Sequence, residues 1–199
     1  MTPPPGTRDR EATKDRIVQA AFDEFTKRGF AGARVDQIAE SAGCNKALLY
    51  QYFGDKEALF EHILVCKMAE IRRMDLDPAR ADETAGRVFD FHAEHPWLSR
   101  LMMWEALDFG TGRVPNEDDR AQHWATHVEN IAQAQRNGTI DPTLDPAEAL
   151  FSLVALIQFW FVAPQTARLI GGEDPYTPEA LERRRAHVIE MARRMLEVR

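Results

Sequence analysis

Apolar residues recur every three or four positions along most of the chain, which is the period of an α-helix that buries one side. The segment from about Arg8 to Arg28 shows the pattern clearly, and Gly29 follows it as a stop signal. Its stripe consists of Ile17, Val18, Ala21, Phe22 and Phe25. The sequence lacks convincing strand alternation, hairpin dipeptides and internal repeats. It therefore predicts an all-α protein.

Several shorter helices are expected next. Residues 35–42 have apolar side chains at i, i+3, i+4 and i+7 and are followed by Gly43. Asn45 can cap a helix over residues 46–53, and Asp55 can cap another that reaches about Arg73. Turn-forming residues then separate predicted helices at about 80–94, 96–109, 117–137, 145–170 and 178–197.

The helix over residues 46–53 has only two turns and carries mostly long polar side chains. At 100° per residue, Leu49 and Phe53 share its inner face, whereas Ala47, Leu48 and Gln51 point outward. So short a helix is marginal alone and needs neighbours to hold it. Two short helices around the tight turn "AGCN" predict a helix-turn-helix, whose second helix enters the major groove of DNA.

Residues 13–60 resemble the N-terminal DNA-binding domain of the TetR/AcrR family of bacterial transcriptional regulators. The most specific parts are "AAFDEFTKRGF", "IAESAG" and "LLYQYFGDKEALF". The resemblance implies a cytoplasmic regulator, most often a repressor, that binds a palindromic operator as a homodimer and is released by a small effector. It implies neither an enzymatic activity nor a cofactor. The expected organisation is a flexible tail (1–8), a helix-turn-helix domain (9–56) and an effector-binding and dimerisation domain (57–199).

The resemblance also assigns roles to residues around the second short helix. Those expected to meet bases are Lys46, Ala47, Leu48 and Gln51, and those expected to meet phosphates are Tyr50, Tyr52 and Lys56. Arg34 and Asn45 complete the predicted DNA-binding set. Arg34 stands where hydroxyl residues are common in the family, so a longer, charged phosphate contact is expected there. Leu48 offers a methyl or shape contact rather than a hydrogen bond.

The helix predicted at 145–170 is apolar nearly all round, so it needs cover on two faces. One face can pack within its own domain, and the other can meet a partner chain together with the last helix. The expected interface consists of Leu153, Leu156, Trp160, Val188, Ala192 and Leu196. Such a dimer would present two DNA-reading helices about 34 Å apart, one for each half-site of a palindrome.

Aromatic and methionine side chains in the middle and later helices predict an apolar or aromatic effector pocket, because such residues line adaptable cavities. The residues predicted to line it are Phe91, Met102, Trp104, Glu105, Trp124 and Phe159. A filled core is the alternative for the apolar members. Glu105 is either a polar anchor, a partner of Arg100 or a solvent-facing carboxylate.

The net charge of −7 argues at first against a nucleic-acid partner. Residues 1–60 nevertheless hold nine basic and nine acidic residues, so the whole negative surplus follows residue 60. Only the N-terminal part can then face DNA. Because that part is not net basic, a helical small-molecule-binding or scaffold protein that does not read DNA remains an alternative. An enzyme is disfavoured, since no nucleophile–base constellation, phosphate loop or metal cluster is recognisable.

Other candidate chemistry in the sequence is weak. Cys44 and Cys66 have no zinc-ligand spacing, which favours a reducing compartment, and Cys44 is either a small turn residue or a redox-sensitive one. His123 and His127 are four residues apart but lack a third ligand, so no metal site is predicted. The longest apolar run stops at Pro164, short of the ~20 residues that span a bilayer, so no membrane partner is predicted.

Overall fold

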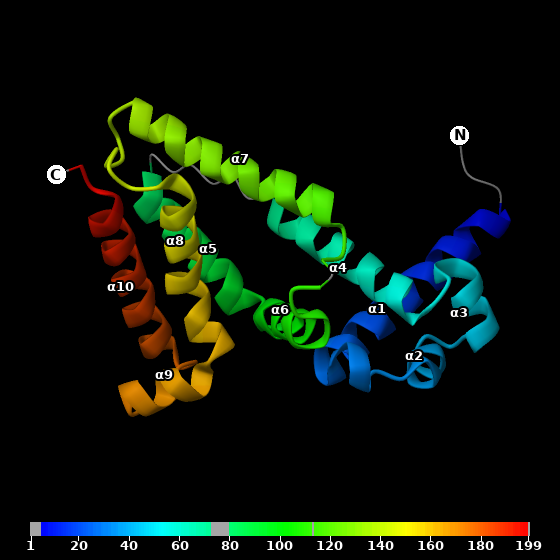
Figure 1. The fold of residues 1–199 in the computed structure, drawn as a ribbon. Coiled ribbons are helices and arrows are strands. Elements are labelled where there is room, and N and C mark those ends of the chain that lie inside the picture. Colours follow the sequence, from blue (N-terminus) through cyan, green and yellow to red (C-terminus); the bar gives the residue numbers. More distant parts are fainter. Residues whose placement is uncertain (1–4, 73–79, 113, 199) are drawn as a thin grey trace. The chain divides into compact units, whose positions relative to one another are not determined.

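The computed structural model describes residues 5–72, 80–112 and 114–198, and every regular element within them is a helix (Figure 1). The helices are α1 (Pro5–Gly32), α2 (Val35–Ser41), α3 (Lys46–Phe53), α4 (Lys56–Arg72), α5 (Ala81–Glu94), α6 (Pro96–Phe109), α7 (Glu117–Arg136), α8 (Pro146–Val162), α9 (Pro164–Gly171) and α10 (Pro178–Leu196). The all-α prediction is confirmed, and most predicted helix ends lie within a few residues of the observed ones.

The chain forms two compact units. The first unit comprises residues 1–74 and 101–117, and the second comprises residues 75–100 and 118–199. The predicted domain boundary after residue 56 lies inside the first unit, to which α4 and most of α6 also belong. The predicted tail is also too long, since α1 begins at Pro5. Residues 1–4 lie outside the described part of the chain.

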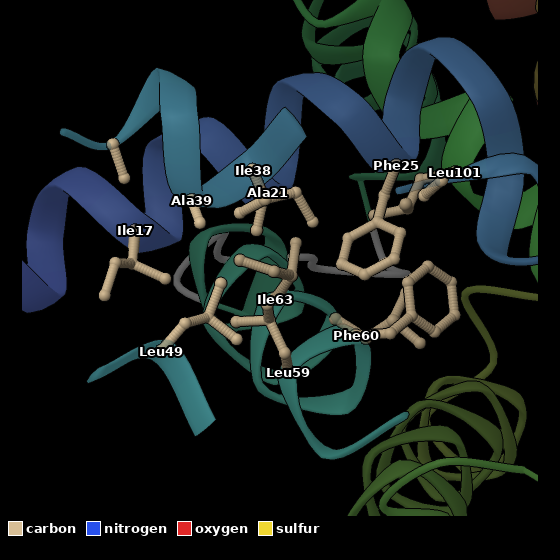
Figure 2. Packing of buried hydrophobic residues seen from close by; sticks show 13 residues of the cluster. Ile17, Ala21, Phe25, Ile38, Ala39, Leu49, Leu59, Phe60, Ile63 and Leu101 are labelled. Carbon is tan, nitrogen blue, oxygen red and sulfur yellow. The ribbon is translucent and has the colours of Figure 1, made fainter. Parts of the chain in front are cut away.

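A single apolar core holds the first unit together. Ile17, Phe25, Leu49, Phe60 and Ile63 are completely buried in it. Figure 2 shows side chains from α1, α2, α3, α4 and α6 meeting there. Burial of one side chain of this size contributes about 1.5–3 kcal/mol to stability. A single buried residue therefore supplies a substantial share of the free energy that holds a short helix in place. The predicted inner position of Leu49 is confirmed.

The C-terminal part of α6 closes this core against the end of α1. Leu101 is fully buried among the α1 and α4 side chains. The ring centre of Phe109 lies 5.3 Å from that of Phe30 and 5.8 Å from that of Phe60. Phe60 in turn meets Phe25 edge to face, with the ring centres 4.9 Å apart. Residues 101–109 are therefore structural members of the N-terminal unit.

The second unit is built on α10, which packs along α5 and α8. Phe89, Phe161 and Val188 are buried where these three helices meet. At the other end of α10, Leu196 packs with Ile131 of α7 and Ala149 of α8. His92 is buried against Phe161, and this burial lowers its pKa to about 4, so the imidazole is neutral at pH 7.

The structure corrects part of the predicted dimer interface. Val188, Ala192 and Leu196 are buried within the unit itself and cannot form an outer surface. The periodicity identified an apolar stripe correctly, but α5 and α8 of the same chain already cover it. Leu153, Leu156 and Trp160 are half-buried against the same clusters. An interface on α10 must therefore use another of its faces.

The single helix predicted at 145–170 is wrong, because α8 ends at Val162 and α9 begins at Pro164. Proline has no backbone N–H to continue the hydrogen-bond ladder, and it biases the preceding residue away from helical geometry. The two helices bend by 84° at this break. Among the described residues no single helix is long and apolar enough to cross a membrane, although this bent pair reaches the required length and composition jointly.

Two glycines in the first unit test its packing. Gly29 and Gly43 both have a positive φ, 71° and 65°, and Gly29 also has a ψ of 178°, a combination that glycine alone adopts readily. A methyl group on Gly29 would lie 2.5 Å from the Trp104 ring. A methyl group on Gly43 would have no atom beyond its chain neighbours within 4 Å. We expect Gly43→Ala to cost about 1–2 kcal/mol through backbone strain alone. Gly29→Ala should cost at least about 1 kcal/mol more, through overpacking against Trp104 together with its more strained backbone.

The measurement is the free energy of unfolding of both variants in urea. Equal losses would show that Trp104 does not press on Gly29.

Candidate DNA-binding surface

The turn between α2 and α3 is fixed by backbone geometry and by one long side chain. The backbone N–H of Cys44 donates to the Ala39 carbonyl at 3.0 Å, which closes α2 around the left-handed Gly43. Arg16 of α1 donates to the Ala42 carbonyl at 3.2 Å. Burial raises the pKa of the Cys44 thiol, which favours its interpretation as a small turn residue over a redox-sensitive one.

The helix α3 presents an exposed polar face above its buried anchor. The side-chain oxygen of Asn45 accepts from the Leu48 N–H at 2.8 Å, so Asn45 caps the helix as expected. Leu49 is buried, whereas Ala47, Tyr50 and Gln51 are exposed. Leu48 and Tyr52 are half-buried. The face expected to meet DNA is thus open.

The cations around this face are not all free. The Lys46 ammonium lies 2.5 Å from the Asp36 carboxylate, an exposed ion pair that sequence reasoning missed. Such a pair contributes about 0–1 kcal/mol, so a phosphate can displace the carboxylate. Lys56 lies over the Phe30 ring at 4.8 Å and donates to the Ala31 carbonyl at 3.4 Å. The fold therefore holds its ammonium close to the end of α1.

Two more residues extend the surface. Arg34 is exposed at the start of α2, and its backbone N–H donates to the buried Glu24 carboxylate at 3.2 Å. This bond fixes the start of α2 while leaving the guanidinium outside. Lys14 lies 5.9 Å above the Tyr52 ring and brings a positive charge that the sequence did not single out. Lys14 lies one helical turn before Ile17 in the sequence, and this spacing is the pattern from which it could have been predicted.

A carboxylate from α6 supports this surface from behind. The Asp108 carboxylate accepts from the backbone N–H groups of Phe30 and Ala31 at 2.8 and 3.3 Å. These groups begin the last helical turn of α1, where the left-handed Gly29 interrupts the normal hydrogen-bond ladder. Because the carboxylate satisfies them, Asp108 fixes the segment that leads into α2. No local sequence pattern points to this contact, because its partners are 78 and 77 positions apart.

The residues predicted for an effector pocket divide between the two units. Trp104 packs against Gly29 in the first unit, and the neighbouring Glu105 is buried. Met102 is half-buried in the same unit. In the second unit, Phe91 stacks on His95 with ring centres 4.2 Å apart, and Trp124 is 41% exposed. Phe159 lines a surface hollow. The pocket itself stays a prediction.

The described residues do not place the two histidines of α7 in a metal site. His123 and His127 have ring centres 4.5 Å apart. Across the described ranges, no cluster of three or more His, Cys, Asp or Glu side chains is arranged to hold a metal ion.

The capped α3, its tight turn from α2 and its exposed polar face define a helix-turn-helix DNA-binding protein. Comparison with known families agrees. Residues 17–63 match the bacterial regulatory proteins of the tetR family, and residues 81–194 match the tetracyclin repressor-like C-terminal domain. The chain therefore belongs to the TetR family of transcriptional regulators, and the predicted family is confirmed.

Individual relatives cover most of the chain. The HTH-type transcriptional repressor SCO4008 of Streptomyces coelicolor is 41% identical over 172 residues, which are 85% of this chain and 90% of the relative. The HTH-type transcriptional regulator RutR of Escherichia coli K12 is 32% identical over 180 residues, 83% of each chain. The crystal structure of SCO4942 from Streptomyces coelicolor has a TM-score of 0.78 and 32% identity, covering 92% of this chain and 98% of that one.

Replacement of Asp108 tests its supporting role. Asp108→Ala removes the acceptor for two backbone donors, so we expect it to lower the free energy of unfolding by about 1.5–3 kcal/mol. Asp108→Asn keeps one acceptor oxygen and should lose less. Urea denaturation measures both, and Asp23→Ala, at an exposed acidic position on α1, is the control. A loss for Asp108→Ala no larger than for the control would contradict the role.

Proposed function

We propose that the protein is a transcriptional repressor that binds a palindromic operator as a homodimer and is released by a small effector. The observation that carries the proposal is the exposed polar face of α3, anchored by Leu49 and capped by Asn45. A rigidly held, outward-facing helix of this kind serves groove reading. The relative named as a transcriptional repressor supports the sense of regulation.

The contacts proposed with DNA follow from chemistry and exposure. Gln51 can pair with an adenine edge, and Ala47 and Leu48 can meet thymine methyl groups. Tyr50, Tyr52 and Lys56 are assigned to phosphates, which position the helix without specifying sequence. Arg34 adds a charged phosphate contact from the start of α2. Lys46 would exchange the Asp36 carboxylate for the edge of a base or a phosphate.

The proposed dimer uses the outer face of α8. Phe151 and Phe159 are 71% and 58% exposed, and Ala155 lies between them at helical spacing and is also exposed. Two phenylalanines on one exposed helical stripe form an apolar surface that a monomer seldom leaves open. A twofold axis beside α8 would bury the stripe against its own copy. This face replaces the buried α10 positions that periodicity suggested.

Release by an effector is proposed for the second unit. Two solved structures of this fold are complexes, one with choline and one with stearoyl-CoA, at 18% and 15% identity and a TM-score of 0.67 each. The helix α6 contributes residues 96–100 to the second unit and residues 101–109 to the first. A ligand that selects another position of α6 would thereby act on the Asp108 and Trp104 contacts with α1.

By linkage, such an effector and the operator must weaken each other's binding by the same factor. The apolar or aromatic character proposed for the effector rests on the residue types of the second unit. As a regulator that binds operator DNA, the protein is proposed to act in the bacterial cytoplasm.

Binding to the DNA that flanks its own gene tests the reading surface. We expect the double variant Tyr50→Ala, Lys56→Ala to lose operator affinity by at least about tenfold, because it removes one phosphate-directed ring and one charge. Lys46→Ala should also lower the slope of log affinity against log salt by about one. The measurement is fluorescence anisotropy over a salt series.

The matched control is Tyr176→Ala in the second unit, since Tyr176 and Tyr50 are both 43% exposed. If the double variant binds as well as the unaltered protein, and selection from random DNA also enriches nothing, the scaffold interpretation replaces this one.

Substitution on α8 tests the dimer. Phe151→Glu places a charge in the proposed apolar interface, so the protein should sediment as a monomer at concentrations where the unaltered chain is a dimer. Leu107→Glu is the control, because Leu107 is 72% exposed, like Phe151 at 71%, but belongs to the first unit. Dimers in both variants, seen by analytical ultracentrifugation, would exclude this face.

A further inference from the structure

A hollow opens on the second unit where the end of α8, the short α9 and the start of α10 come together. Its volume is about 410 Å³, which is within the range of small-molecule sites. Its lining includes Phe159, Trp160, Glu173, Pro175, Arg183 and Arg184. They all belong to the second unit.

Two aromatic side chains of α8, those of Phe159 and Trp160, form a flat apolar part of the wall of the hollow. The Trp160 indole N–H donates to the Pro175 carbonyl at 3.3 Å, which fixes the ring and the loop before α10 relative to each other. The Phe159 ring lines the hollow next to Trp160. The hollow can therefore take a planar apolar group.

An uncompensated cation lies in the same hollow. The Arg184 guanidinium sits 5.4 Å from the centre of the Trp160 ring and donates to the Leu156 carbonyl at 2.7 Å. Its Nε is buried and has no hydrogen-bond partner among the described residues. Burial lowers the pKa of Arg184, but not enough to deprotonate a guanidinium at neutral pH.

The other arginines of α10 differ in this respect. Arg183 pairs with Glu173, and Arg185 pairs with Asp90. Arg193 and Arg194 share Glu190. Arg184 has no carboxylate partner in the described part of the chain, so its positive charge is balanced only by a carbonyl dipole and the face of an indole ring. A partly buried charge in this state favours an anion that reaches it.

We propose that this hollow binds a small organic anion that joins a flat aromatic ring to a carboxylate. The carboxylate meets the Arg184 guanidinium, and the ring lies along Trp160 and Phe159. The Glu173 carboxylate at the rim does not repel the ligand strongly, because Arg183 neutralises it. The site is separate from the DNA-reading surface, so it stands whether or not the proposed operator binding does.

Calorimetric titration of the full chain tests the site with two probes of one shape, 2-naphthoate and the uncharged 2-naphthamide. One naphthoate should bind per protomer, at least about tenfold more tightly than naphthamide, since a charge-assisted bond is the stronger kind. Arg184→Gln should weaken naphthoate by at least about tenfold and leave naphthamide unchanged, because the aromatic walls remain. Arg194→Gln, elsewhere on the same helix, should change neither.

Equal affinity for the two probes, no binding at millimolar concentration, or unaltered naphthoate binding by Arg184→Gln would overturn the proposal. If Arg184→Gln binds neither probe, Arg184→Lys decides, since it keeps the charge and most of the volume. A preference for naphthoate in that variant supports the site, and its loss overturns it.

Discussion

The DNA-reading helix depends on a core that it cannot build itself. With two turns, α3 has too few hydrogen bonds to be stable alone, and its fully buried anchor is Leu49. Its position is set by α1, α2 and α4, whose apolar side chains meet around that anchor. The polar face can be given over to DNA because the opposite face is held by neighbours that are themselves held together. Groove reading is in this sense a property of the whole first unit.

The helix α6 joins two duties in one element. Its first residues belong to the second unit, and Leu101, Asp108 and Phe109 complete the first. The contacts made by Asp108 and Trp104 concentrate on the single turn around Gly29, directly before α2. These contacts tie the C-terminal part of α6 to the segment that leads into the helix-turn-helix.

Local patterns predicted the helices and the exposed face of α3 well, because both depend on nearby residues. Asn45, Asp55 and Gly43 act within a few positions of themselves, and the structure places them as caps and turn. The predictions were wrong where the structure depends on contacts between residues that are distant in the sequence. The stripe on α10 was apolar as read, but no periodicity shows whether α5 or a second chain covers Val188. Trp104 was predicted to line a pocket. Its actual contact with Gly29 joins residues far apart in the sequence, so no local pattern shows it. Pro164 is visible in the sequence as the end of the apolar run, and it divides into α8 and α9 what periodicity alone joins into one helix.

The support that Asp108 gives to residues 30 and 31 bridges 78 and 77 positions of sequence. During synthesis the ribosome therefore releases α1 to α4 long before the helix that finishes their core. Until α6 emerges, Phe30 and Phe60 lack the ring of Phe109, and two backbone donors lack their carboxylate. Until then the nascent N-terminal helices remain incompletely packed. A gene fragment that ends after α4 would encode the reading helix without the residues that hold it in place.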